Sequence, residues 1–312
     1  MRDRTVGLII LLASLALAGG CDQRPAGGPA GVLRVFGETG LGPGEFSYPR
    51  AAALGPDGRL YVVDKAARIQ VFNADGAFVR AWRMPAWDAG KPTGLTIDDR
   101  GRVLVADTHY FRVIVFDAEG GELARLGSQG DGPGQFLLPT DVAVDAEGCI
   151  FVAEYSGNDR ISKFTPAFEY LFSFGGRDSG AARLQRPQSL LVDGDALWVA
   201  DACNHRICRF GLDGTFRGAF GRSGTARGEL RFPYGIDRLP DGTLIVAEFG
   251  NNRIQRFDRE GRSLGTWGAA GRGAGQLAYP WAVQADDAGR IFIIDSGNNR
   301  VQVLDAARVA WQ

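Results

Sequence analysis

Residues 127–154 read GSQGDGPGQFLLPTDVAVDAEGCIFVAE, and residues 157–164 continue the pattern with GNDRISKF. In this stretch a glycine-rich loop leads to a proline, and short apolar segments follow, separated by turns that contain glycine or asparagine. Short runs rich in Val, Ile and Phe between such turns are typical of β-strands. No segment of useful length has a helical period. The stretch therefore predicts consecutive short strands joined by tight turns.

The same pattern recurs six times from residue 32 onward. A proline opens each unit, and the prolines are 43 to 48 residues apart. Each unit contains four strand signals, which we label a to d in chain order. A repeat of this length with four short strands predicts an all-β fold, a six-bladed β-propeller of four-stranded antiparallel blades. The repeated prolines are Pro49, Pro92, Pro139, Pro187, Pro233 and Pro280.

An acidic residue ends the second strand of each unit, and an arginine follows it four to six residues later. We interpret these as structural ion pairs, which tie together either the two ends of each b–c loop or neighbouring blades. A feature present in all six units offers little of the asymmetry that a site requires. The pairs are Asp64 with Arg68, Asp107 with Arg112, Glu154 with Arg160, Asp201 with Arg206, Glu248 with Arg253 and Asp295 with Arg300.

The units resemble NHL repeats over residues 32–304. The resemblance rests on the stretch quoted above, on FGNNRIQRF at residues 249–257 and on SGNNRVQVL at residues 296–304. Units two and four depart from it, because MPAWDAGKP at 84–92 and RDSGAARLQRP at 177–187 lack the glycine-rich loop. The resemblance implies a six-bladed propeller. It also implies a role as an interaction platform or as the outer part of a sensor.

Ring closure requires a d strand for the last unit. Val32–Phe36 precedes the first unit and has the d-strand pattern, so we expect this strand to complete the last blade. The closed ring leaves no unprotected sheet edge of the kind that invites aggregation. The C-terminal residues 308–312 compete for the same position, but they are three residues out of step. The sequence thus assigns residues 32–312 to one propeller.

The N-terminus has the pattern of an export signal. Residues 1–20 combine a basic start, a 13-residue apolar run and small residues, which is typical of a secretory signal. A membrane-spanning helix would need about 20 apolar residues. The signal and Cys21 resemble a bacterial lipoprotein signal, whose cleavage leaves a lipidated cysteine. This implies a lipid anchor in the bacterial cell envelope, outside the cytoplasm, with residues 21–31 as a tether. A plain secretory signal is the alternative.

Composition argues against several functional classes. Lys and Arg total 35 and Asp and Glu total 36, so no overall basic charge favours nucleic acid. The chain has only two histidines, which rules out a three-histidine metal site. Three cysteines remain after Cys21, namely Cys149, Cys203 and Cys208, and this odd number leaves at least one thiol free. We predict neither a metal nor a cofactor.

The candidate binding face is the one that carries the d–a and b–c loops, which are longer and more variable than the turns opposite. The residue after each proline is expected near the mouth of the central channel. In the amidating lyases, a related six-bladed family, three such positions are zinc-binding histidines, and none is histidine here. These residues are Arg50, Thr93, Thr140, Gln188, Tyr234 and Trp281.

Further candidates come from the b–c loops. His109 and Tyr110 resemble an exposed contact patch, and Tyr155 and Phe249 begin the loops of units three and five. Tyr234 and Trp281 either form an aromatic contact site or cap the core. Asp141 offers one carboxylate, which is too little for calcium, whose sites take six to eight oxygens.

These observations predict an extracytoplasmic, lipid-anchored propeller that binds a protein or peptide partner. The alternatives are a lyase or hydrolase acting at the channel mouth, and a binder of cell-wall glycans.

Overall fold

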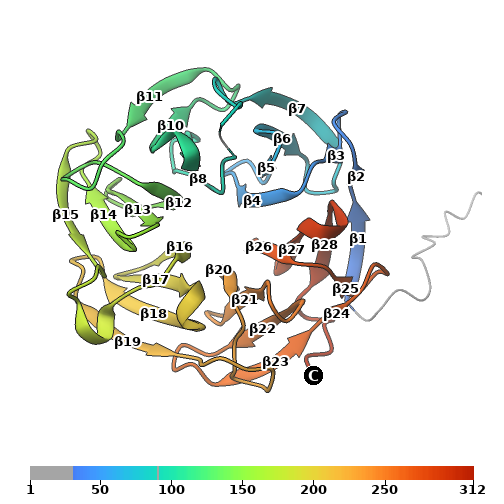
Figure 1. The fold of residues 1–312 in the computed structure, drawn as a ribbon. Helices are drawn as coiled ribbons and strands as arrows, with labels where there is room; N and C mark the ends of the chain where they lie inside the picture. Colours follow the sequence, from blue (N-terminus) through green and yellow to red (C-terminus); the bar gives the residue numbers. More distant parts are fainter. Residues whose placement is uncertain (1–30, 90) are drawn as a thin grey trace, which may run out of the picture.

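The computed structural model describes residues 31–89 and 91–312. The expected signal sequence, Cys21 and nearly all of the tether lie outside the described residues. Six four-stranded antiparallel sheets are arranged as blades around a central axis (Figure 1). The predicted all-β six-bladed propeller is confirmed.

In every blade the a strand lies nearest the centre of the ring and the d strand lies at its rim (Figure 1). The a strands are β4 Pro49–Leu54, β8 Gly94–Ile97, β12 Leu138–Val144, β16 Pro187–Asp193, β20 Pro233–Arg238 and β26 Pro280–Ala285. The b strands are β5 Leu60–Asp64, β9 Val103–Asp107, β13 Ile150–Tyr155, β17 Ala196–Asp201, β21 Leu244–Glu248 and β27 Arg290–Asp295. The c strands are β6 Arg68–Phe72, β10 Arg112–Phe116, β14 Arg160–Phe164, β18 Arg206–Gly211, β22 Arg253–Phe257 and β28 Arg300–Asp305. The d strands of blades one to five are β7 Phe78–Arg83, β11 Glu122–Leu126, β15 Tyr170–Phe174, β19 Phe216–Phe220 and β23 Ser263–Trp267.

The two ends of the described chain meet in the closure of the ring. Strand β1 (Val32–Phe36) pairs antiparallel with β28, with Val32 opposite Leu304 and Phe36 opposite Val301. The expected closure by Val32–Phe36 is therefore confirmed. The C-terminal segment takes a different place, because Gln312 exchanges two backbone hydrogen bonds with Thr266 at the edge of β23. The closure position is already filled by β1, so this segment adds to blade five.

The core lies between adjacent blades. The b strand of each blade is buried along its whole length or nearly so, because the neighbouring blades pack against both of its faces. One cluster joins Phe72 of the first blade to Phe292 of the last, and Phe36 of β1 packs on Phe72 with ring centroids 5.2 Å apart. The ring closure is thus a packed interface as well as a strand pairing.

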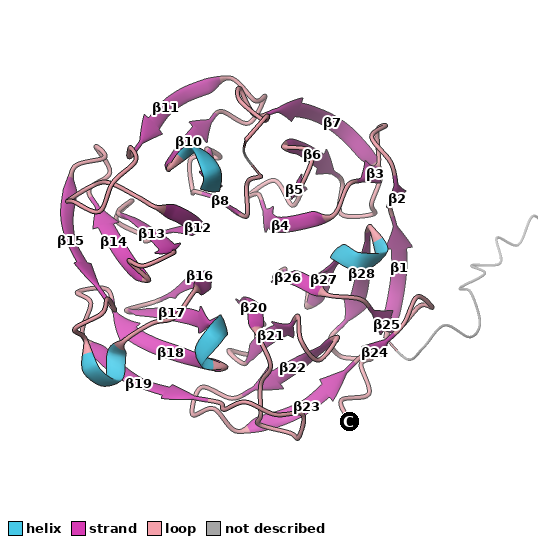
Figure 2. Cartoon of the chain, viewed as in Figure 1, coloured by secondary structure: helices cyan, strands magenta, loops and turns pink. Residues whose placement is uncertain are grey.

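The remaining elements are short (Figure 2). Two pairs of two-residue strands run parallel in the d–a loops, and single 3₁₀ turns occupy three b–c loops and one d–a loop. The short strands are β2 Glu38–Thr39 with β3 Glu45–Phe46, and β24 Ala269–Ala270 with β25 Gln276–Leu277. The 3₁₀ turns are η1 Thr108–Tyr110, η2 Gly180–Ala182, η3 Ala202–Asn204 and η4 Ser296–Asn298. None of these helical turns has the length or apolar character needed to cross a bilayer.

Neighbouring blades are joined by a recurring hydrogen bond on the loop face. A residue with positive φ in one b–c loop accepts a hydrogen bond from the backbone N–H of the residue before the next blade's proline. We call these bonds inter-blade staples. The staples are Tyr48 N–H to Asn299 Oδ1 (2.7 Å), Arg186 N–H to Asp159 Oδ1 (2.8 Å), Phe232 N–H to His205 Nδ1 (3.1 Å) and Tyr279 N–H to Asn252 Oδ1 (2.8 Å). Ala67 and Phe111 hold the corresponding positions in blades one and two, and their side chains carry no acceptor.

Candidate functional site

The residues that follow the repeated prolines are positioned by β-bulges. In five blades the a strand pairs with the b strand at the proline and again two residues later, which leaves the residue between them without a partner. A bulge of this kind redirects one side chain out of the alternation of the strand. The bulged residues are Arg50, Thr140, Gln188, Tyr234 and Trp281.

The bulged side chains converge on the channel, as the sequence predicts. A mouth cavity of about 310 Å³ and a deeper cavity of about 210 Å³ share Arg50, Thr93, Gln188 and Trp281 in their walls. Thr140 lines the mouth cavity and Tyr234 lines the deeper one. All six post-proline positions therefore contribute to one continuous site formed by all six blades.

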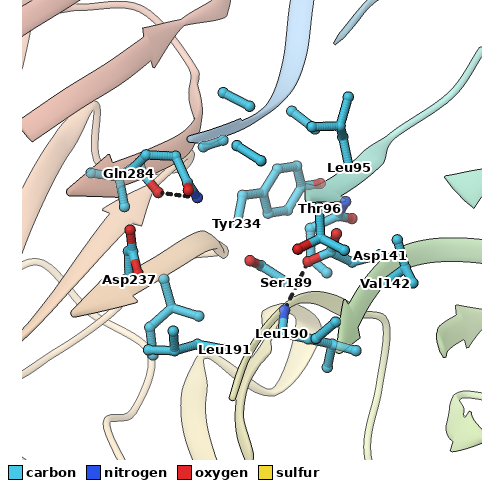
Figure 3. A pocket seen from close by; sticks show the side chains of 18 of the residues that line it. Leu95, Thr96, Asp141, Val142, Ser189, Leu190, Leu191, Tyr234, Asp237 and Gln284 are labelled. Atoms are coloured by element: carbon cyan, nitrogen blue, oxygen red, sulfur yellow. Dashed lines mark hydrogen bonds between the residues drawn. The ribbon is translucent and has the colours of Figure 1, made fainter. Parts of the chain in front are cut away.

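The deeper cavity has two carboxyl residues on opposite sides, the buried Asp141 and the partly exposed Asp237 (Figure 3). The Asp141 carboxylate accepts a hydrogen bond of 2.8 Å from the Leu190 N–H of the next blade. Asp237 likewise accepts a 2.7 Å hydrogen bond from the Ala285 N–H. Burial raises the pKa of each carboxyl to about 7, although these backbone donors oppose the change. Both acids connect neighbouring blades across the channel wall.

The aromatic residues at the mouth form a small packed cluster. Tyr234 and Trp281 are each only 7% exposed, and their ring centroids are 4.9 Å apart. Phe249 stacks on Tyr234 at 4.5 Å, so it too is part of the cluster. Of the two readings of Tyr234 and Trp281, the structure favours a cap on the core over an exposed contact site. Tyr279 packs against Phe249 and is 50% exposed, which makes it the most exposed of these rings.

The b–c loop candidates separate into different environments. His109 lines the mouth cavity, and its pKa is lowered by partial burial and by the nearby charges of Arg50 and Lys91. Tyr155 also lines this cavity, with the Arg186 guanidinium 5.0 Å above its ring. Tyr110 lies under Arg112, and its hydroxyl accepts a hydrogen bond from the Ala89 N–H. The expected patch of His109 and Tyr110 is therefore divided, with only His109 at the cavity.

All six acid–arginine pairs form, with N–O distances between 2.6 and 2.9 Å. Each pair joins the end of a b strand to the start of the c strand in the same blade. Arg253, for example, also donates to the carbonyls of Thr225, Ala226 and Glu229 in the preceding d–a loop. Glu248 accepts a hydrogen bond from the Arg231 N–H of that loop. In five blades the arginine thus holds the preceding d–a loop in place, whereas the hydrogen bond described for Arg112 goes to Asp107.

Metal ligation at the mouth was tested against the side chains present. The post-proline positions carry Arg, Thr, Gln, Tyr and Trp, and no imidazole. In residues 31–89 and 91–312 no group of three His, Cys, Asp or Glu side chains is placed to hold a metal ion. His205 and Cys203 do not form a ligand pair, because His205 Nδ1 is engaged in its staple. The zinc arrangement of the amidating lyases does not fit these residues.

Sequence reasoning missed three cations at the mouth. Lys65, Lys91 and Arg186 line the mouth cavity together with Arg50. Lys91 and Arg186 stand directly before repeated prolines, and Lys65 directly follows a repeated acid. The sequence feature that could have found them is that the residue beside each repeated proline or acid varies between units, although the proline or acid itself recurs.

Comparison with known proteins agrees with the repeat architecture. The NHL repeat signature matches residues 90–116, 184–210, 230–257 and 277–304. The four matched segments lie in blades two, four, five and six. It is 29% identical over 207 residues to NHL repeat-containing protein 3 of Homo sapiens, a match that covers 59% of this chain and 55% of the relative. The chain therefore spans about half the length of this curated relative.

The chain is also similar to an amidating monooxygenase in sequence and to a lyase in structure. The peptidylglycine alpha-amidating monooxygenase of Rattus norvegicus is 34% identical over 134 residues, which cover 39% of this chain and 14% of the rat protein. A solved streptogramin B lyase superposes with a TM-score of 0.63 at 18% identity, over 86% of this chain and 96% of the lyase. At that identity the structural match shows the fold alone.

Proposed function

We propose that this NHL-repeat propeller binds a protein or peptide partner through the face that carries its d–a and b–c loops. The observation that carries the proposal is the set of bulges, which direct one differing side chain from each of five blades to a single channel. Regular features such as the acid–arginine pairs hold the loops, and variable residues occupy the position where a ligand would enter. Such a division suits a scaffold that presents a binding surface.

We further propose that the protein works outside the cytoplasm of a bacterial cell, held to a membrane by lipid on Cys21. The export pattern of residues 1–20 and the cysteine that follows it support this location. Stable anchoring by lipid requires more than one acyl chain. In a Cys21→Ser variant we expect the protein to leave the membrane fraction while the propeller stays folded. Retention of the variant in that fraction would contradict the lipid anchor.

The partner proposal is tested by chemical crosslinking in native membranes followed by identification of the captured protein. The structure changes the choice of variants, because truncating the packed Tyr234 and Trp281 would damage the core. Tyr279→Ala and His109→Ala instead remove exposed or cavity-facing groups on the loop face. Leu171→Ala, on the exposed rim strand β15, is the matched control.

A partner that the wild type and the control capture, and the loop-face variants lose, would support the proposal. A partner captured equally by all variants would refute this choice of face.

An enzymatic role is the second candidate, and one observation favours it. The deeper cavity holds Asp141, whose pKa of about 7 suits a group that exchanges a proton near neutral pH. A lyase or hydrolase reading predicts turnover of a small substrate that Asp141→Asn abolishes. A glycan binder is less well supported, because Tyr234 and Trp281 have little exposed ring surface on which a sugar would stack.

A further inference from the structure

The mouth cavity is lined by positive charge. Four cationic side chains, Arg50, Lys65, Lys91 and Arg186, contribute to its wall, and His109 lies among them. No Asp or Glu is part of this wall. The carboxyls of Asp141 and Asp237 lie in the deeper cavity, where backbone N–H groups bind them. The whole chain has a formal charge of −1, so this concentration of cations is local.

These four cations have no acidic partner among the residues that the structure describes. Elsewhere in that part of the chain, arginines commonly form ion pairs, as the six repeated acid–arginine pairs do. Arg50 instead donates to the Lys91 carbonyl at 3.4 Å and lies 5.0 Å from the centre of the Trp281 ring. Arg186 donates to Gln188 Oε1 at 3.3 Å. Like charges held together without a counterion repel one another, and an anion at their centre would relieve that repulsion.

Buried donors point to the same conclusion independently. Gln188 is 3% exposed, and its Nε2 has no hydrogen-bond partner. The Nε1 of Trp281 and the Nε of Arg50 are likewise buried and unpartnered. All three side chains line the mouth cavity. A buried donor without an acceptor is costly, and a structure rarely keeps several of them in one place unless an acceptor binds there.

We propose that the channel mouth binds a small oxyanion, a carboxylate or a phosphate. Arg50 and Arg186 supply charge-assisted hydrogen bonds, and the amide of Gln188 and the indole of Trp281 supply neutral donors. The cavity has a volume of about 310 Å³, which is the volume of roughly ten water molecules in the liquid and is enough for a carboxylate or phosphate group. The source of the oxyanion rests on the proposed function. If the propeller binds a protein or peptide, the oxyanion is part of that partner, as an acidic side chain or as the carboxylate at its chain terminus.

The test is isothermal titration calorimetry on the purified full chain in non-ionic detergent. The probes are citrate, inorganic phosphate, and a short peptide with a free C-terminal carboxylate beside the same peptide with an amidated end. We expect saturable binding of at least one oxyanion, weaker at high NaCl because salt screens the cations. The free and amidated peptides distinguish a chain terminus from a free small anion as the source.

Three variants locate the site. Arg50→Gln should weaken oxyanion binding by about tenfold or more, the worth of one charge-assisted hydrogen bond. Gln188→Met removes a neutral donor, together with the acceptor of the Arg186 hydrogen bond, and should weaken binding. Arg100→Gln removes the same charge from an exposed a–b turn and should keep the affinity within about twofold. Thermal unfolding of each variant checks that it folds.

Equal binding by the wild type and Arg50→Gln would overturn the proposal, and so would the absence of saturable binding by every probe. The crosslinking experiment tests the partner proposal independently of the titration. Oxyanion binding that depends on Arg50, without any captured partner, would support the site and refute the partner.

Discussion

His205 offers a direct test of the inter-blade staples. Its Nδ1 accepts the Phe232 N–H at 3.1 Å, and its ring contacts the Phe232 ring with centroids 4.6 Å apart. Asn252 and Asn299 perform the same function between other blades. His205→Asn should therefore keep the staple and lose the ring contact, whereas His205→Ala should lose both.

The expected losses follow from these two contacts. A hydrogen bond of this type is worth about 1 kcal/mol, and an aromatic pair adds about 1 kcal/mol. At pH 8 we expect the free energy of unfolding to fall by about 1 kcal/mol in His205→Asn and by about 2 kcal/mol in His205→Ala. Asparagine also tolerates the positive φ of 55° at this position, which favours it further over alanine.

The staple also makes stability depend on pH. Partial burial, assisted by the charge of Arg231, lowers the pKa of His205. The unfolded chain then binds a proton more readily than the folded one. The contribution of His205 is therefore complete above the ordinary pKa of about 6.5 and is lost as the pH falls below it. Protonation of Nδ1 would remove the acceptor. The asparagine variant has no such proton to gain.

Urea denaturation followed by tryptophan fluorescence, between about pH 8 and about pH 5, measures these differences. The wild type should lose its advantage over His205→Asn as the pH falls. Equal stability of the Asn and Ala variants at pH 8 would refute the staple. A constant difference between the wild type and His205→Asn across this pH range would refute its titration.

Three further predictions concern the channel wall and the ring closure. Gly94→Ala should destabilise the fold by about 1–3 kcal/mol in the same assay, because a Cβ there would lie 2.4 Å from the Thr140 carbonyl oxygen; an unchanged midpoint would contradict this close approach. Asp141→Asn should gain stability relative to the wild type as the pH rises from 4 to 7, by on the order of 4 kcal/mol. The reason is that the raised pKa of about 7 makes ionisation of the buried carboxyl unfavourable, and a difference that does not change with pH would contradict it. Phe36→Ala should cost about 2–4 kcal/mol, since Phe36 packs β1 against Phe72 of the first blade; a loss below about 1 kcal/mol would mean that the closure depends on backbone pairing alone.

The fold could be predicted because its markers repeat. Six prolines, acids and arginines in step indicate a ring of blades, and the spare d-strand pattern at Val32–Phe36 indicates where the ring closes. The bulges after the prolines could not be predicted, because they depend on how each a strand pairs with its neighbour. The same pairing decides that Tyr234 and Trp281 are packed against each other, which their sequence positions alone leave open.

The cations of the mouth escaped prediction for a related reason. Lys65, Lys91 and Arg186 come from different blades and lie far apart in the sequence. Only the curvature of the ring brings them together with Arg50. The regular markers of the repeat draw attention to themselves, and these residues stand beside a marker, at positions where the residue type varies between units. The staple at His205 was missed because its acceptor changes from Asn to Asp to His between units.

The pairing of β1 with β28 has a consequence for the timing of folding. Val32 pairs with Leu304, and Tyr48 donates to Asn299, so both contacts join residues more than 250 positions apart. Contacts of such long range form slowly, because much chain entropy is lost before they contribute. During synthesis β1 has no partner strand until β28 of the last blade has been made, so the hydrogen-bonding edge of β1 stays unpaired until then. Assembly of this ring is thus delayed until its last blade has been translated, and a chain shortened by one blade would keep an unpaired edge at each end.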